Sequence, residues 1–463
     1  MLVLILLYYI SQAAFTGSIP IDSDAISSSV ESPWSNYFCL DAQHCRTIWN
    51  IIWSSLTTIF SCTWVAVRPN IPSPVKTQAM SFWERLWHSV ESSVSNRLRL
   101  FVIALFVPEC ILAWAIRQWL EAGRIARKHE DSDWTRAHGF FVIMGGFHLF
   151  ESPLDGPREE NGKPPQQNIL AEPPFLHPHT NGNPIRRIDE KELFSPNNGL
   201  QFSLPTEREI TDRCKGDGLA KSFVLIQTTW FLMQCIARGI ERLPVTKLEL
   251  VACAYAIVNS AVYFFWWNKP LSAGFPVRVL GTPGAPQQQL DQLEATEWLF
   301  VGHLAHIAIV HVLGVPDADV SFAELKMAPM FWSNTLQHIV FLADAITSLI
   351  GVLFGAIHCI AWSFPFPSLT EGMLWRISCA GMVVLPSLLL PIGWLLFRFP
   401  VDFKLPEWVQ RLLTFFLLGL LLLATLVYIF GRITTLTLAL TTLRSLPPAA
   451  YETVHWTTFI PHV

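Results

Sequence analysis

The chain has 463 residues, of which 51% are apolar and only 15% are charged, and its net charge is -4. A soluble domain normally carries about 25% charged residues. The apolar residues gather in blocks, which is typical of membrane spans. The small negative charge provides no basic surface for a nucleic acid, so an integral membrane protein that binds no nucleic acid is expected.

The N-terminal region divides into an apolar and a polar part. Residues 1–17 begin with MLVLILLYYISQAA and continue with small and polar residues. This pattern resembles a signal peptide, although it has no positive charge at its start. Residues 18–46 are polar and are expected to be luminal, where Cys39 and Cys45 could form a disulfide.

Nine apolar blocks along the rest of the chain predict an all-α fold, a polytopic transmembrane helical bundle with about eight or nine spans. The block at 138–150 is short for a span and is expected to be re-entrant or tilted. The block at 298–314 contains three histidines, and its assignment stays open. The predicted regions are a first transmembrane group (47–150), a Pro-rich polar loop (151–215), a second group (216–314), a loop (315–337), a third group (338–430) and a C-terminal tail (431–463).

The Pro-rich loop is the one long interruption of the apolar pattern. Ten prolines lie between Pro153 and Pro205, with polar residues among them. Such a density of proline argues against helix or strand and predicts an exposed, extended segment.

Basic residues give contradictory orientations for the block at 99–120. Arg97 and Arg99 lie before it and favour a cytosolic location for the preceding loop. Arg124 and Lys128 follow it, where a single span would require the lumen. The positive-inside rule therefore conflicts with itself at this block.

Pro108 and Glu109 lie inside the apolar run LFVIALFVPECILAWAI (100–116). A charged side chain at membrane depth costs about 2.5 kcal/mol or more, so such residues are functional candidates by default. The proline cannot donate to the carbonyl of Ala104, which leaves a free acceptor nearby. On a helix, Arg117 falls on roughly the same face as Glu109 and could be its partner. Glu109 could form a structural hydrogen bond to a neighbouring helix. Alternatively, it could donate or accept a proton in a cavity.

Asp344 is the second acid within an apolar block. Helical spacing places Asp344, Ser348, Gly351, Gly355 and His358 on one face. Small residues in such a stripe permit close helix packing, and the alternative is a pocket lining. Asp344 and His358 are about 21 Å apart along the helix axis and cannot form one catalytic pair.

The fourth and fifth long blocks also carry polar residues. Gln227, Gln234 and Arg238 align on one helix face. The next block opens with Thr246 and, three residues later, Glu249, which is the spacing of a capping box. Glu249 is therefore interpreted as a helix cap rather than a catalyst.

Metal and cofactor signatures are weak. His303 and His306 could share a helix face, but no nearby acid completes a metal site, so they are interpreted as core or cavity residues. The sequence contains no Walker loop, no GxGxxG and no DDxxD stretch. We therefore expect neither a metal nor a cofactor.

Several stretches together carry a family resemblance. They are TWVAVRPNIPSP (63–74), HGFFVIMGGFHLFE (138–151), KGDGLAKSFVLIQTTWFLMQCIARG (215–239) and LRSLPPAAYETVHWTTFIPHV (443–463). The chain resembles a large, mostly uncharacterised family of fungal multi-pass membrane proteins. Some proteins of this type are similar to transmembrane cyclases that fold the prenyl tail of meroterpenoids. The resemblance implies a membrane enzyme of secondary metabolism, expected in the endoplasmic reticulum or another endomembrane.

A cofactor-free terpene cyclase needs a buried acid, a dry cavity and aromatic faces that stabilise a cation. Glu109 and Asp344 are the candidate proton donors to an olefin or epoxide of an apolar prenylated small molecule. The candidate substrate-binding residues are Trp114, Gln227, Trp230, Gln234, Arg238, Tyr263 and His358.

Two other functions use the same residues differently. A transporter or proton-coupled carrier would use the acids as a relay, although no internal repeat is visible. A receptor or scaffold would use the Pro-rich loop as a docking surface. In each case membrane lipid surrounds the chain.

Overall fold

The computed structural model describes residues 45–71, 97–150, 184–194, 204–212, 217–271, 276–280, 333, 337–402 and 406–455. The predicted signal peptide, Cys39 and the block at 298–314 lie outside these residues. Cys45 is disulfide-bonded, and its partner also lies outside them because the six other described cysteines are free.

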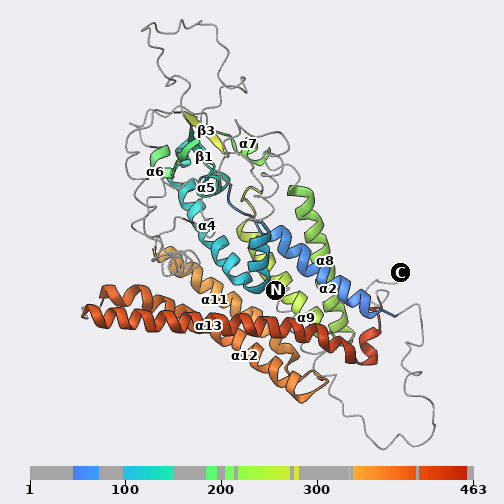
Figure 1. Ribbon diagram of the computed structural model, residues 1–463. Helices are drawn as coiled ribbons and strands as arrows, with labels where there is room; N and C mark the ends of the chain where they lie inside the picture. Colours follow the sequence, from blue (N-terminus) through green and yellow to red (C-terminus); the bar gives the residue numbers. More distant parts are fainter. Residues whose placement is uncertain are drawn as a thin grey trace, which may run out of the picture.

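Long helices build most of the described structure, which confirms the helical class (Figure 1). One further helix, Arg97–Phe106, comes before α4. The long helices are α2 (Ile48–Ala66), α4 (Pro108–Lys128), α8 (Asp217–Ile240), α9 (Lys247–Phe265), α11 (Gln337–Cys359), α12 (Leu369–Asp402) and α13 (Glu407–Thr441).

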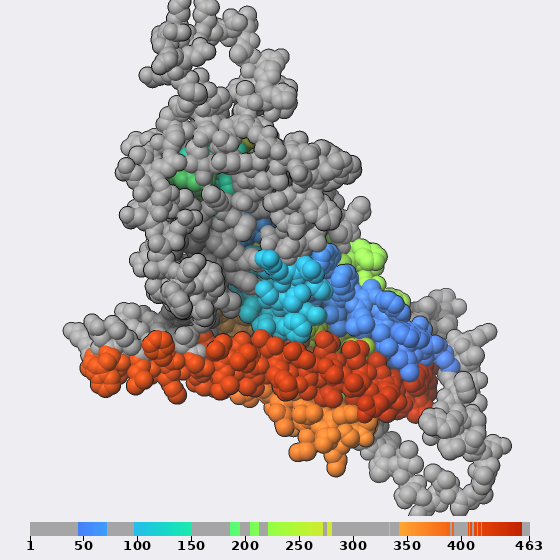
Figure 2. Space-filling model, in the orientation of Figure 1, coloured from blue at the N-terminus to red at the C-terminus, as the bar shows by residue number. Residues whose placement is uncertain are grey.

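The helices pack around α9 and α11. Helix α9 contacts α2, α4 and α11, and α12 packs against both α11 and α13. Figure 2 shows α13 as a continuous ridge across one face, beside α4 and α2. Its outer face exposes large apolar side chains such as Trp408, Phe415 and Phe430, as expected of a lipid-facing helix.

Four described helices are long and apolar enough to cross a membrane. The number of candidate spans rises to five if a bent helix pair counts as one span. The described residues therefore support a membrane bundle, and the larger number of about eight or nine spans stays a prediction. The four are Lys221–Ile240, Lys247–Phe265, Leu342–Ser363 and Phe415–Ser445.

The block at 99–120 does not form one straight helix, because the chain bends within it. The helix Arg97–Phe106 and α4 meet at an angle of 115°. Arg97 donates to the carbonyl of Trp64 (3.0 Å), near the end of α2, and Gln118 of α4 donates to Asn70 (3.3 Å), just beyond α2. Both arms of the bend therefore return to the same end of the bundle.

The bent pair is either a broken span or a re-entrant hairpin. Ten residues of helix span about 15 Å, half of the ~30 Å hydrocarbon core. A re-entrant hairpin would enter and leave the membrane on one side, and Arg97 and Lys128 would then lie on that side. Both groups of basic residues would then fit one side of the membrane, and the orientation stays a prediction.

A small sheet lies at this end of the bundle, so the prediction of a purely helical fold is wrong here (Figure 1). Strand β1 (Phe147–Phe150) pairs antiparallel with β2 (Pro184–Arg187) and parallel with β3 (Val277–Leu280). The block at 138–150 is not one continuous helix: it forms most of α5 (Arg136–Ile143) and then β1. Gly145, with φ 83°, makes the tight turn between them.

The segment 151–215 contains more order than its prolines predict. Besides β2 it forms α6 (Glu190–Leu193) and α7 (Glu207–Asp212), so the expectation of no helix or strand is wrong for these parts. Glu190 attaches α6 to the end of α4, because it accepts bonds from Arg124 (2.6 Å) and Lys128 (2.9 Å).

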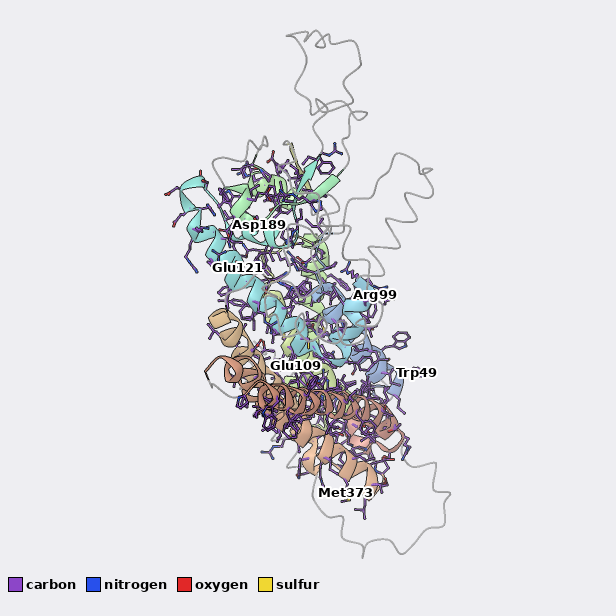
Figure 3. All side chains as sticks on the ribbon, turned by 60° about the vertical axis from the view of Figure 1, so that its left-hand side comes forward. Trp49, Arg99, Glu109, Glu121, Asp189 and Met373 are labelled. Carbon is purple, nitrogen blue, oxygen red and sulfur yellow. The ribbon has the colours of Figure 1, made fainter. Side chains whose placement is uncertain are left out.

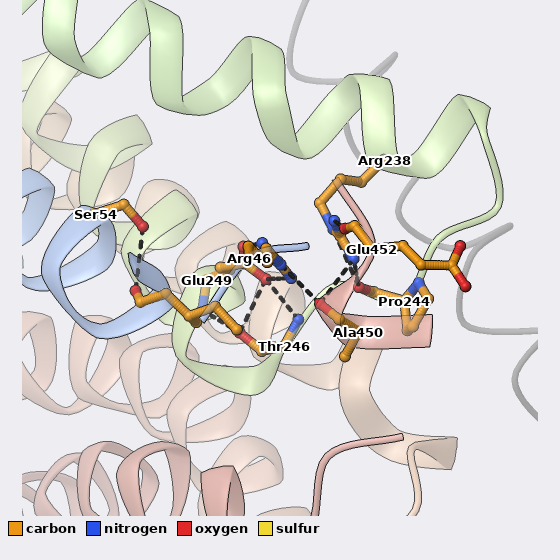
Figure 4. A network of polar contacts seen from close by, with 9 residues as sticks. Arg46, Ser54, Arg238, Pro244, Thr246, Glu249, Ala450 and Glu452 are labelled. Carbon is orange, nitrogen blue, oxygen red and sulfur yellow. Dashed lines mark hydrogen bonds and ion pairs between the residues drawn. The ribbon is translucent and has the colours of Figure 1, made fainter. Parts of the chain in front are cut away.

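A polar network closes the opposite end of the bundle (Figure 4). Thr246 and Glu249 form the capping box that the sequence predicts. Glu249 also binds Arg46, and Arg238 donates to the carbonyls of Pro244 (2.8 Å) and Glu452 (2.6 Å). The predicted tail from 431 is wrong at its start, because α13 continues to Thr441.

Candidate functional site

The candidate site lies where the helix pair breaks. The first arm ends at Phe106, Val107 is non-helical (φ -139°, ψ 67°), and Pro108 begins α4. Proline suits the first position of a helix, where its missing N–H breaks no bond. The break therefore frees the last carbonyls of the first arm, rather than the carbonyl of Ala104 alone.

Side chains from other helices satisfy two of these carbonyls. The Tyr255 hydroxyl donates to the carbonyl of Leu105. The Arg432 Nε donates to the carbonyl of Phe106 (3.2 Å). An end of helix at membrane depth is tolerated only where protein groups cover it, and these two bonds provide that cover.

Glu109 lies in the first turn of α4 and is only 8% exposed. Figure 3 shows it where α4 meets α13, with Glu121 farther along α4 toward the sheet. The Tyr428 hydroxyl donates to its Oε1 (2.8 Å). Its Oε2 is buried and has no hydrogen-bond partner among the described residues. A Cβ at Gly351 would lie 3.3 Å from the Glu109 Cγ, so this glycine lets α11 approach the acid.

Arg432 brings a buried cation to the same place and is 4% exposed. Its guanidinium carbon lies 3.8 Å from the ring centre of Phe354, 5.3 Å from that of Tyr255 and 5.8 Å from that of Tyr428. These rings stabilise the cation through their π faces. Its Nη2 is buried without a hydrogen-bond partner among the described residues.

We call Glu109, Tyr255, Phe354, Tyr428 and Arg432 the Glu109 centre. The last four belong to α9, α11 and α13 and lie near the middle of the apolar spans Lys247–Phe265, Leu342–Ser363 and Phe415–Ser445. The positive end of the α4 dipole lies at Glu109, and the negative end of the first arm lies at Arg432. The helix break therefore favours an acid at Glu109 and a cation at Arg432. Among the described residues, the Glu109 Oε2 and the Arg432 Nη2 have no hydrogen-bond partner.

Asp344 and Arg117 form a second ionic contact, and this corrects the expected pairing of Arg117 with Glu109. The Arg117 Nη2 donates to the Asp344 Oδ1 and joins α4 to α11. Arg117 is buried and Asp344 is partly exposed. The two candidate acids are thus not equivalent, because Asp344 has an arginine partner and Glu109 has a tyrosine.

The small-residue stripe of α11 supports close helix packing. Ser348 donates to the carbonyl of Pro386 (2.6 Å). A Cβ at Gly355 would meet the Met382 backbone at 2.8 Å, so α12 touches α11 there. His358 is buried and its Nδ1 lies 2.8 Å from the carbonyl of Phe354.

The expected substrate-binding residues are not brought together. Trp114 is buried against Trp266 (5.0 Å between ring centres) and lies 4.3 Å from the Lys269 ammonium. Trp230 is 47% exposed on the outer side of α8, where Gln227 and Gln234 are half-buried. Arg238 lies in the network at the opposite end, and the buried Tyr263 lies near the end of α9. These residues do not form one pocket.

Tyr428 and Arg432 are the residues that sequence reasoning missed. Arg432 interrupts the apolar helix α13, which is the signal that made Glu109 a candidate. The predicted boundary at 431 placed it in a tail and hid that signal. His303 and His306 lie outside the described residues.

Comparison with known proteins adds a partial family match. Residues 202–290 are similar to a family described as a family of unknown function, DUF8562. No curated protein and no solved structure matches the chain. The resemblance to fungal membrane proteins and to terpene cyclases stays a prediction.

Proposed function

We propose that this protein is a proton-coupled membrane carrier for a small organic solute, and that Glu109 exchanges the proton. The supporting observation is the broken helix whose end holds a buried, half-paired carboxyl group. Many secondary carriers place coupling ions and solutes at the ends of discontinuous helices near the membrane midplane.

Polar groups along α4 offer the proton a route to the sheet end of the bundle. Eight residues beyond Glu109, Arg117 binds Asp344, and one turn further Glu121 accepts from Arg124 (2.7 Å). Arg117 lies just over two turns, about 12 Å, from Glu109 along α4, and Glu121 lies on the turn next to Arg117. In the carrier, the Arg117–Asp344 contact is the gate between Glu109 and water.

Arg432 gives the Glu109 centre a means of holding a solute. A free guanidinium N–H donates, and a free carboxyl oxygen accepts or carries the proton. A solute with one acceptor and one donor group would satisfy both atoms. Neither atom has another partner among the described residues, so the bound solute would give a hydrogen-bond partner to two buried polar atoms that lack one.

A terpene cyclase is the second candidate. Tyr255, Phe354 and Tyr428 surround the region of Glu109 with aromatic rings, which suits a carbocation. Arg432 lies over those rings, so cyclisation there requires Arg432 to withdraw. We therefore rank the carrier above the cyclase.

The test uses the full chain in proteoliposomes that contain a pH-sensitive dye. A panel of organic acids, amino acids and prenylated phenols is added outside under an inward proton gradient. We expect one class to accelerate internal acidification, and Glu109→Gln to abolish this. Glutamine keeps the acceptor for Tyr428 but carries no proton. Glu207→Gln, on the exposed helix α7, is the matched control and should behave as wild type.

Solute-dependent proton entry that survives Glu109→Gln would contradict the proposal, as would its absence across the panel. The cyclase alternative has its own assay, in which purified protein receives a prenylated phenol or its epoxide. Product that forms with wild type and is lost with Glu109→Gln or Asp344→Asn would establish the cyclase instead.

A further inference from the structure

The guanidinium groups of Arg127 and Arg136 lie close together beside Gly123, near the end of α4. A Cβ at Gly123 would lie 3.2 Å from the Arg136 Nη2 and 3.7 Å from the Arg127 Nη1. Arg127 comes from the last turn of α4, and Arg136 opens α5. The buried glycine therefore leaves room for two guanidinium groups above it.

This arginine pair, Arg127 and Arg136, has no counter-ion among the described residues. Arg124 and Lys128, on the same turns of α4, bind Glu121 and Glu190 instead. The Arg136 Nε is buried and has no hydrogen-bond partner in the described part of the chain. Two guanidinium charges beside one glycine repel each other, and burial together with the Arg127 charge lowers the pKa of Arg136. An anion between the two groups would relieve that repulsion.

The surroundings of the arginine pair are those of a membrane interface. The Arg136 guanidinium carbon lies 4.2 Å from the ring centre of Trp119, which packs against Phe265 (5.6 Å). Phe264 beside it is 65% exposed. Tryptophan and other aromatic residues mark the level of lipid head groups, and cations beside them meet anionic lipids.

We propose that Arg127 and Arg136 bind the phosphate of an anionic phospholipid, whose acyl chains lie along Trp119 and Phe264. Arginine suits phosphate because its planar fork donates two parallel hydrogen bonds. The site is separate from the Glu109 centre and does not depend on transport or catalysis.

The experiment measures lipid binding to delipidated full-length protein by native mass spectrometry. The protein in detergent is titrated with dioleoyl phosphatidylserine and, separately, with dioleoyl phosphatidylcholine. We expect a preference for phosphatidylserine, weakened about fivefold by Arg127→Gln or Arg136→Gln and about thirtyfold by both together. Arg208→Gln, an exposed arginine on α7, is the matched control and should leave the affinity unchanged.

Equal binding of phosphatidylserine by wild type and the double variant would overturn the proposal. Displacement of the lipid by millimolar inorganic phosphate would also overturn it, because a free anion would then be the ligand. If Arg136→Gln fails to fold, Arg127→Glu provides the test, since this exposed side chain supports no other described contact. It should abolish the preference for phosphatidylserine, and an unchanged preference would refute the site.

Discussion

Glu109 and Glu249 are two glutamates in similar local positions with opposite surroundings. Each lies in the first turn of a long helix, and each is buried. Glu249 accepts from the backbone and hydroxyl of Thr246 (2.8 and 2.9 Å) and from both ends of the Arg46 guanidinium. Glu109 accepts from Tyr428 alone and keeps one oxygen without a partner among the described residues.

This difference in hydrogen-bond partners distinguishes a structural acid, Glu249, from a candidate functional acid, Glu109. A buried carboxylate with all its partners holds its neighbours in place, and removing it leaves a buried cation unpaired. A buried carboxyl with a vacant oxygen contributes little to stability and can accept a proton or a ligand. The same Glu→Gln substitution should therefore lower the folding free energy strongly at Glu249 and only slightly at Glu109.

The largest effect is expected for Glu249→Gln. The amide cannot balance the Arg46 charge, so the variant should lose about 3–5 kcal/mol of folding free energy. Thermal unfolding in mild detergent measures this through a thiol-reactive dye, because Cys235 and Cys253 are buried near the cap. The melting temperature should fall sharply.

Glu109→Gln in the same unfolding assay is the matched comparison. Glutamine still accepts from Tyr428, so the folding free energy should change by less than about 1 kcal/mol. If Glu109→Gln were as destabilising as Glu249→Gln, the carboxyl would be structural and the distinction between the two residues would fail.

Local patterns were enough to predict some of these features. The spacing of Thr246 and Glu249 predicts the capping box, and Pro108 with Glu109 predicts a candidate site at the position where the helix pair breaks, although the break itself was not predicted. The stripe from Asp344 to His358 predicts close packing of α11, which Gly355 makes against α12. Each of these depends on residues within a few turns of one helix.

Features that depend on distant residues were not predictable. Helix spacing suggested Glu109 as the partner of Arg117, and only the fold shows that Arg117 binds Asp344, 227 positions away. Arg432 meets Phe106 from 326 positions away. The three strands of the sheet come from separate parts of the chain, and no β-hairpin turn motif in the sequence predicts their pairing.

A smaller effect is expected for Tyr428→Phe, which removes the one hydrogen bond to Glu109. The carboxyl then has no partner among the described residues, and leaving it unsatisfied should cost about 1–2 kcal/mol. The same detergent unfolding assay measures this loss. In proteoliposomes, solute-driven proton entry should become slower, because the hydroxyl no longer holds the Glu109 carboxyl in place.

Tyr451→Phe is the control for Tyr428→Phe, because this tyrosine lies in the short helix at the opposite end. A Tyr428→Phe protein that transports at the wild-type rate would show that the hydroxyl does not position Glu109 for transport. That outcome would make the Glu109 centre a packing feature and bring Glu109 closer to Glu249 in role.

The smallest effect concerns Glu190, a third carboxylate that is well paired but lies outside the bundle. Burial alone would raise its pKa, but the bonds from Lys128 and Arg124 outweigh burial and lower the pKa of Glu190. For an acid whose folded pKa is lowered, the added stability is present above the unfolded value of about 4.3 and is lost as pH falls through the folded value.

The melting temperatures of wild type and Glu190→Gln should therefore differ at neutral pH and converge as the pH falls below about 4. Glu130→Gln, an exposed glutamate just beyond α4, should match wild type throughout. A difference that stays constant down to that pH would mean that Glu190 holds α6 by packing rather than by charge. Glu190 would then no longer be a paired acid like Glu249, and pairing would not distinguish the structural carboxylates from Glu109.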